Sequence, residues 1–194
     1  MIKLFGRTIP AVARGLRGEA LHPETPLTSR FRVLPHDIDA NLHLNNGRYL
    51  QFMDVNRMEW LLRTRVLQII LRNRWKPILG STSIQFRREL RLWETGVVST
   101  RLAGWDDRWV FLEHSVETVG GRPVALALAK AGFRCRDAWV PVAALLEQLP
   151  YAAPHQSELP KHVAAGIALD QAFTGRFRAP RSLEVSEVPA AAAE

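Results

Sequence analysis

The chain has 194 residues, of which 47% are hydrophobic and 23% are charged, and it contains one cysteine. These totals are typical of one globular domain with additional terminal segments. The single Cys135 excludes an intrachain disulfide, and no apolar run approaches the length of a membrane span. The formal charge of +7 comes mostly from arginine, which suits a phosphate-bearing partner such as nucleic acid, an anionic membrane surface or a phosphorylated small molecule.

The chain opens with residues 1–27, which we expect to form an N-terminal arm packed on the domain. The first apolar stretch is too short for a secretory signal. A basic amphipathic segment that makes weak contact with a membrane surface is the alternative for residues 1–20. The alternating residues Thr28 to Leu34 then predict a strand, which Pro35 ends.

A helix is expected from about Gly47 to Arg63, with Asn45 or Asn46 as its N-cap. Its apolar residues cover most of the circumference, which indicates a buried helix. The charged residues of such a helix need partners, and Asp54 and Arg57 have the spacing to pair with each other. A second helical stretch is predicted over 66–74.

From Pro77 the pattern becomes alternating and predicts a series of long strands. The expected strands span residues 78–89, 94–105, 108–118 and 123–136. The pair Gly120-Gly121 favours a tight hairpin between the last two. A strand, a buried helix and then antiparallel strands indicate an α+β hotdog fold, in which a curved sheet of about five strands wraps around one central helix.

The predicted hotdog domain spans residues 28–140, and residues 141–178 form a C-terminal helical extension. Within it, helices are expected over 141–149 and 161–173. Residues 179–194 are rich in Ala, Pro, Ser and Glu, a composition typical of a disordered tail.

The polar segment before the buried helix carries the strongest functional pattern of the sequence. Between Asp37 and Tyr49 it places carboxylates, an imidazole and two carboxamides just ahead of a helix start. A helix start offers free backbone N–H groups, which can stabilise an oxyanion. A nearby carboxylate can attack a carbonyl or activate a water molecule. The segment therefore holds the groups that thioester hydrolysis requires.

The run Asp37-x-Asp39-x-x-x-His43-x-Asn45-Asn46-x-x-Tyr49 resembles the first motif of the 4-hydroxybenzoyl-CoA thioesterase-like hotdog family. The short sequence segments at 32–35, 43–50 and 104–108 resemble those of the branch that includes thioesterase superfamily member six. The resemblance covers roughly Thr28 to Arg136. It implies an acyl-CoA thioesterase that needs no metal or cofactor, and a homodimer or homotetramer with substrate sites between subunits.

The resemblance also implies roles for individual residues. Asp39 corresponds to the catalytic aspartate, as nucleophile or general base, and His43 and Asn46 complete the expected catalytic group. Basic residues near the phosphates of coenzyme A include candidates at 134 and 136 by position and charge. The expected substrate-binding residues are Asp37, Asn45, Gly47, Tyr49, Arg87 and Arg88. A cytoplasmic location is expected.

Other interpretations remain open at this point. Leu42 stands where the family usually has glycine, which motivates a non-catalytic module that binds acyl-CoA or lipid. A basic surface adaptor for membrane or nucleic acid ranks last, because the chain has no aromatic-basic recognition motif, and no nucleic-acid partner is expected. Asp39 could act as a turn cap, and Glu59 is the alternative catalytic acid, although a salt bridge is its more ordinary role.

Overall fold

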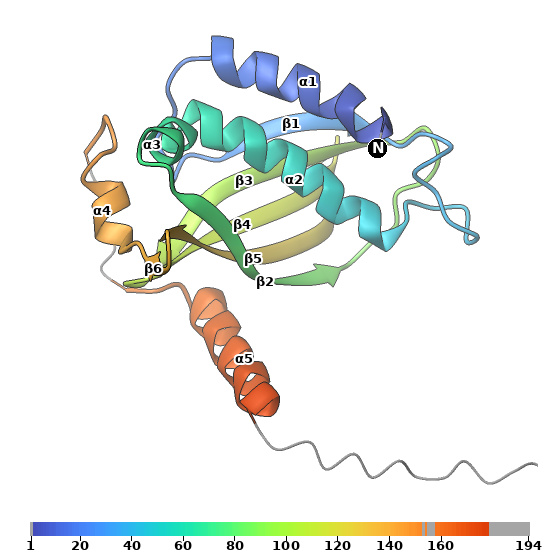
Figure 1. Ribbon diagram of the computed structural model, residues 1–194. Helices are drawn as coiled ribbons and strands as arrows, with labels where there is room; N and C mark the ends of the chain where they lie inside the picture. The colour runs from blue at the N-terminus through green and yellow to red at the C-terminus, as the bar shows by residue number, and fades with distance from the viewer. Residues whose placement is uncertain (1, 153, 155–157, 179–194) are drawn as a thin grey trace, which may run out of the picture.

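The protein folds around one curved antiparallel sheet, seen in a computed structural model that describes residues 2–152, 154 and 158–178 (Figure 1). The main helices and strands are α1 (Ile2–Arg17), β1 (Leu27–Arg32), α2 (Asn46–Arg63), α3 (Val66–Arg72), β2 (Lys76–Phe86), β3 (Thr95–Trp105), β4 (Trp109–Thr118) and β5 (Pro123–Cys135). They are followed by β6 (Ala138–Trp139), α4 (Val142–Leu146) and α5 (Lys161–Arg178).

The sheet has the order β1-β3-β4-β5-β2, and the short β6 pairs with β5. All pairings are antiparallel, and the sheet curls around α2 (Figure 1). This confirms the predicted hotdog architecture. The sequence pattern did not predict β6, because two residues are too few to show a periodic pattern. The strands β1 and β2 form the two edges of the sheet.

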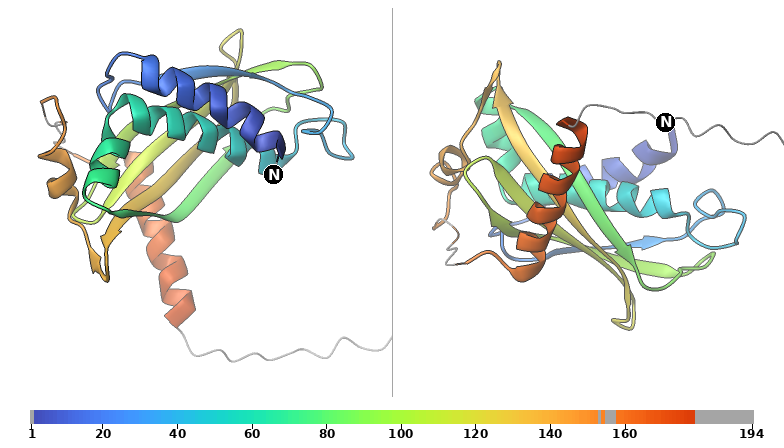
Figure 2. Two further views of the ribbon diagram at one scale, coloured as in Figure 1. Left: turned by 45° about the horizontal axis from the view of Figure 1, so that its top comes forward. Right: turned by 90° about the horizontal axis from the view of Figure 1, so that it is seen from below.

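Helix α2 lies between two layers, which explains why its apolar residues cover most of its circumference. One side packs on the concave face of the sheet and the other contacts α1 (Figure 2). Met53 and Trp60 are nearly inaccessible to solvent, as is Ala11 of α1. Glu59 is buried and accepts two hydrogen bonds from Arg14 of α1, at 2.6 and 3.0 Å. The salt-bridge interpretation of Glu59 is confirmed, as is the predicted pair of Asp54 with Arg57.

A chain of buried polar side chains connects α2 to the sheet. The Asn56 amide donates to the Ser29 hydroxyl at 2.9 Å, and the Thr100 hydroxyl donates to Asn56 Oδ1. His114 Nδ1 lies 2.8 Å from the same Thr100 oxygen. Burial lowers the pKa of His114 to about 3, so this ring is neutral in the folded protein at physiological pH. These bonds fix how α2 is seated on the sheet.

The C-terminal extension covers part of the opposite, outer face of the sheet (Figure 2). Val163 of α5 is fully buried against Phe111 and Ala103. Lys130 pairs with Asp170 of α5. This helix continues to Arg178, beyond its predicted end at residue 173. The predicted disordered tail, 179–194, lies outside the described residues. Among the helices that the structure describes, none is long and apolar enough to cross a membrane.

Candidate active site

A small hairpin just before α2 carries the candidate catalytic residues. Ile38 and Leu44 form an antiparallel bridge, and the Asp39 amide donates to the His43 carbonyl at 3.0 Å. The Leu42 amide donates to the Asp39 carbonyl at 3.0 Å, which closes a four-residue turn inside this hairpin. A turn followed by a left-handed residue is a common way to close a short hairpin. The hairpin therefore fixes Asp39 and His43 on neighbouring positions.

Leu42 occupies the left-handed position of this hairpin, with φ at 62°. Glycine is the residue that adopts such a conformation without steric cost. The leucine therefore adopts a backbone conformation that a glycine would favour. Leu42 is 72% exposed, so its side chain projects into solvent.

The Asp39 carboxylate is partly accessible, with a side-chain exposure of 24%. Its Oδ1 accepts a hydrogen bond from the Asn41 amide at 2.9 Å and lies 3.8 Å from His43 Nδ1. His43 itself bridges by its backbone to Arg91 of the neighbouring loop. The structure thus brings the predicted pair Asp39 and His43 together, with the carboxylate still open to a substrate or a water molecule.

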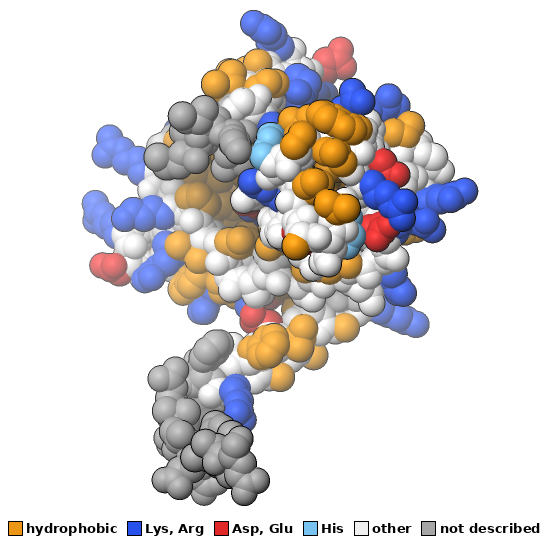
Figure 3. Space-filling model, turned by 90° about the vertical axis from the view of Figure 1, so that its right-hand side faces the viewer, with side chains coloured by type: hydrophobic (Ala, Val, Ile, Leu, Met, Phe, Trp, Pro, Cys, Tyr) orange, Lys and Arg blue, Asp and Glu red, His pale blue; other side chains and the backbone are white. Residues whose placement is uncertain are grey.

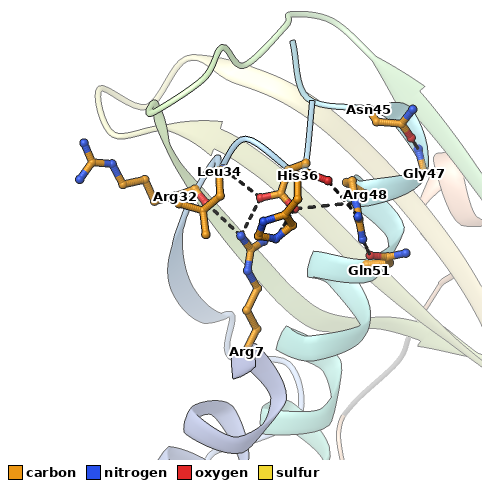
Figure 4. Close-up of polar contacts among 9 residues, drawn as sticks. Arg7, Arg32, Leu34, His36, Asn45, Gly47, Arg48 and Gln51 are labelled. Carbon is orange, nitrogen blue, oxygen red and sulfur yellow. Dashed lines mark hydrogen bonds and ion pairs between the residues drawn. The ribbon is translucent and has the colours of Figure 1, made fainter. Parts of the chain in front are cut away.

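Asp37, in contrast, is buried, with 1% of its side chain exposed. Its partners Arg7, Leu34, His36 and Arg48, labelled in Figure 4, come from α1, the loop and the start of α2. Arg7 of α1 donates to its Oδ2 at 2.6 Å, and the Leu34 amide donates to the same oxygen at 3.0 Å. His36 and Arg48 lie 3.4 and 3.8 Å from its Oδ1. These contacts place Asp37 in the protein interior, where it holds the loop in place.

The start of α2 is capped by the chain itself. Asn45 is the N-cap, and its side-chain oxygen accepts from the Gly47 amide at 2.9 Å. The Gly47 amide, which the sequence analysis offered for a substrate carbonyl, is therefore already occupied. The Asn46 amide has no hydrogen-bond partner within the described part of the chain. It is the donor that remains at this helix start.

The other predicted substrate-binding residues differ in burial and in their position along the sheet. Tyr49 is buried beside Phe86, and burial raises its pKa to about 12. Arg87 and Arg88 are exposed, and their amides bond to the carbonyl of Val124 at the start of β5. The bases at 134 and 136 lie at or just beyond the far end of the same long strand. Arg87 and Arg88 belong to the segment that continues to Arg91, which bridges to His43 of the Asp39 hairpin.

The sequence pattern did not predict the participation of α1. Arg7 reaches the site loop, stacks over the Phe52 ring at 4.5 Å, and also donates to the Arg32 carbonyl at 3.3 Å. The spacing of Arg7 and Arg14, two turns apart on one face, was the signal that both could meet acids of a neighbouring element. Among the described residues, no group of three or more His, Cys, Asp or Glu could hold a metal ion.

Comparisons with known proteins agree with this architecture. Protein THEM6 from Xenopus laevis is 40% identical over 81 residues, which is 42% of this chain and 39% of that protein. The chain spans about half or less of the length of the curated THEM6 relatives it matches.

Solved structures of thioesterases share the fold. YbaW, a probable thioesterase from Escherichia coli, has a TM-score of 0.59 and 20% identity over 64% of this chain and 99% of its own. The 4-hydroxybenzoyl CoA thioesterase from Pseudomonas sp. strain CBS-3 has a TM-score of 0.55 and 18% identity over 63% of this chain and 97% of its own. The model of the family described as "Thioesterase-like superfamily" matches residues 33–166. The chain therefore belongs to the thioesterase-like superfamily.

Proposed function

We propose that the protein hydrolyses an acyl-CoA thioester to a free acid and coenzyme A. The observation that carries this proposal is the Asp39 carboxylate, partly exposed and fixed by Asn41 and His43 in the hairpin that leads into α2. A carboxylate in such a position can act on a carbonyl without a metal ion. The names of the structural relatives, which include a 4-hydroxybenzoyl CoA thioesterase, support the same substrate class.

In the proposed reaction, Asp39 either attacks the thioester carbonyl or removes a proton from the attacking water. The Asn46 amide, at the positive end of the α2 dipole, donates to the carbonyl oxygen as negative charge develops there. The C–S bond then breaks, and the thiolate of coenzyme A leaves and takes up a proton. Where Asp39 has attacked, water then hydrolyses the anhydride between Asp39 and the acyl group, which releases the free acid and restores the carboxylate. His43, beside Asp39, orients the carboxylate or stabilises its charge.

The exposed guanidinium groups of Arg87 and Arg88 are the proposed contacts for the phosphates of coenzyme A, since arginine matches phosphate oxygens.

Strand β2 is an edge of the sheet, and it carries no charged residue from Pro77 to Phe86. Such an unprotected edge invites pairing with another strand. We therefore propose a homodimer in which β2 pairs with its symmetry mate; a homotetramer would need a further surface.

The test is release of free thiol from a panel of acyl-CoAs of short, long and aromatic acyl groups. Asp39→Asn should reduce kcat by at least about a hundredfold, because general base catalysis contributes that much or more. The matched control is Asp54→Asn, which changes an exposed helical aspartate paired with Arg57 and should leave turnover unchanged.

Three outcomes separate the interpretations. Loss of turnover in Asp39→Asn, with the fold retained, supports the proposed mechanism. Full activity of that variant would move the chemistry to another acid. No turnover by the wild-type protein on any substrate, together with retained acyl-CoA binding, would favour the non-catalytic module. That module was motivated by Leu42, which keeps the glycine-like backbone conformation.

A further inference from the structure

Arg7 of α1 contacts three separate parts of the structure around the candidate active site. Its Nη2 donates to the Asp37 carboxylate at 2.6 Å and to the carbonyl of Arg32, the last residue of β1, at 3.3 Å. Its guanidinium carbon lies 4.5 Å from the centre of the Phe52 ring of α2. One side chain therefore connects the end of the first strand, the loop that follows it and the helix after that loop.

The backbone of Asp37 extends this connection to both groups of the proposed reaction. Its carbonyl accepts from the Asn45 amide at 2.9 Å, at the end of the hairpin where α2 begins. Asn45 is the N-cap of α2, and the Asn46 amide beside it is the proposed donor to the substrate carbonyl. Asp39 follows Asp37 on the first side of the same hairpin. A displacement of Asp37 would therefore change the separation of the catalytic carboxylate and the amide.

The contact between Arg7 and Asp37 is buried, with side-chain exposures of 22% and 1%. It differs from the charges at the surface of this side of the molecule, where Lys, Arg, Asp and Glu side chains stand among hydrophobic ones (Figure 3). Exposed ion pairs hold their partners weakly, whereas a buried pair resists separation. Reacting groups need such restraint, because a misplacement of about 1 Å can cost a hundredfold in rate.

We propose that Arg7 is a positioning residue for the hydrolysis. Through Asp37 it holds the Asp39 carboxylate and the Asn46 amide at the separation that the reaction requires, although it bonds to neither. The inference rests on the proposed function, and it makes α1, which precedes the first strand of the sheet, a part of the apparatus for the reaction. Loss of Arg7 should lower kcat more than it changes KM, because the substrate contacts proposed above remain.

Arg14 provides a matched control on the same helix. It lies about two turns from Arg7, and its Nη2 is 2.6 Å from the buried carboxylate of Glu59, the same separation as in the Arg7–Asp37 pair. Glu59 is near the C-terminal end of α2, whereas the hairpin meets the N-terminal end. Arg14→Ala therefore removes a comparable ion pair and leaves the contacts of Asp37 in place.

The experiment measures thiol release from the acyl-CoA panel by the full chain, under conditions where circular dichroism shows each variant folded. Arg7→Ala should lower kcat by about ten- to a hundredfold with little change in KM, and Arg14→Ala should keep the kcat of the wild type. Arg7→Lys should recover part of the rate. Guanidinium ion, added below its denaturing range, should raise the rate of Arg7→Ala alone. Equal kcat losses in Arg7→Ala and Arg14→Ala would overturn the proposal, since they would indicate a merely structural role.

Hydrogen exchange of backbone amides uses no thioester and separates this inference from the proposed function. The Leu34 and Asn45 amides both bond to Asp37. They should exchange about tenfold faster in Arg7→Ala, as local opening becomes easier, and at the rate of the wild type in Arg14→Ala. If the wild type releases no thiol from any substrate, these rates still decide. Unchanged exchange in Arg7→Ala overturns the positioning role, whereas faster exchange retains it in a site with a different reaction.

Discussion

The ion pair between Arg7 and Asp37 makes the N-terminal helix a support of the loop that carries the candidate active site, and Arg7→Ala tests this directly. The Asp37 side chain is 1% exposed and Arg7 is 22% exposed, with 2.6 Å between Nη2 and Oδ2. Removing one partner of a buried ion pair costs about 3–5 kcal/mol. Because Arg48 and His36 stay near the other oxygen, we expect Arg7→Ala to lower the free energy of unfolding by about 2 kcal/mol.

Urea unfolding of four proteins measures the pair: wild type, Arg7→Ala, Asp37→Asn and the double variant. The double variant should cost less than the sum of the single ones, by about 1–2 kcal/mol, since the two side chains share one interaction. Arg7→Lys should recover part of the loss, because a lysine keeps the charge but not the second donor to the Arg32 carbonyl. Strictly additive costs, or a loss below about 0.5 kcal/mol for Arg7→Ala, would refute the coupling.

The structure predicts how three further changes affect the free energy of unfolding. Leu42→Gly should raise the free energy of unfolding by about 0.5–1 kcal/mol, because relief of the left-handed strain exceeds the added chain entropy; a lower melting temperature in calorimetry would contradict this. Since burial lowers the pKa of His114 from 6.5 to about 3, the unfolded chain takes up a proton in that window that the folded protein does not. Stability should therefore fall below pH 6.5 by about 1.4 kcal/mol per pH unit from this group, a slope that His114→Gln should lose in urea titrations, whereas an unchanged slope would assign it to other groups. Gly96→Ala should destabilise by about 1–3 kcal/mol in the same assay, because its methyl group would overlap the Phe31 ring; a neutral effect would mean that the ring moves freely.

Local sequence pattern determined most of the fold. The alternation of polar and apolar residues predicted the long strands, and the Gly120-Gly121 pair marked the hairpin that the structure contains, with Gly121 at a φ of 76°. The apolar residues around the whole of α2 indicated its burial. These signals are readable because strand and helix periodicities depend on neighbours only a few residues apart. The Asp-x-Asp motif likewise located the candidate site from residues that are adjacent in the chain.

Only the tertiary structure decided which member of that motif faces solvent. Asp37 and Asp39 are two residues apart and chemically equivalent in sequence, yet one is buried against Arg7 and the other remains open beside His43. The difference depends on Arg7 of α1, which lies 30 residues before Asp37 in the chain. Contacts between such distant segments depend on how the helices and the sheet pack, and no short-range pattern encodes that packing.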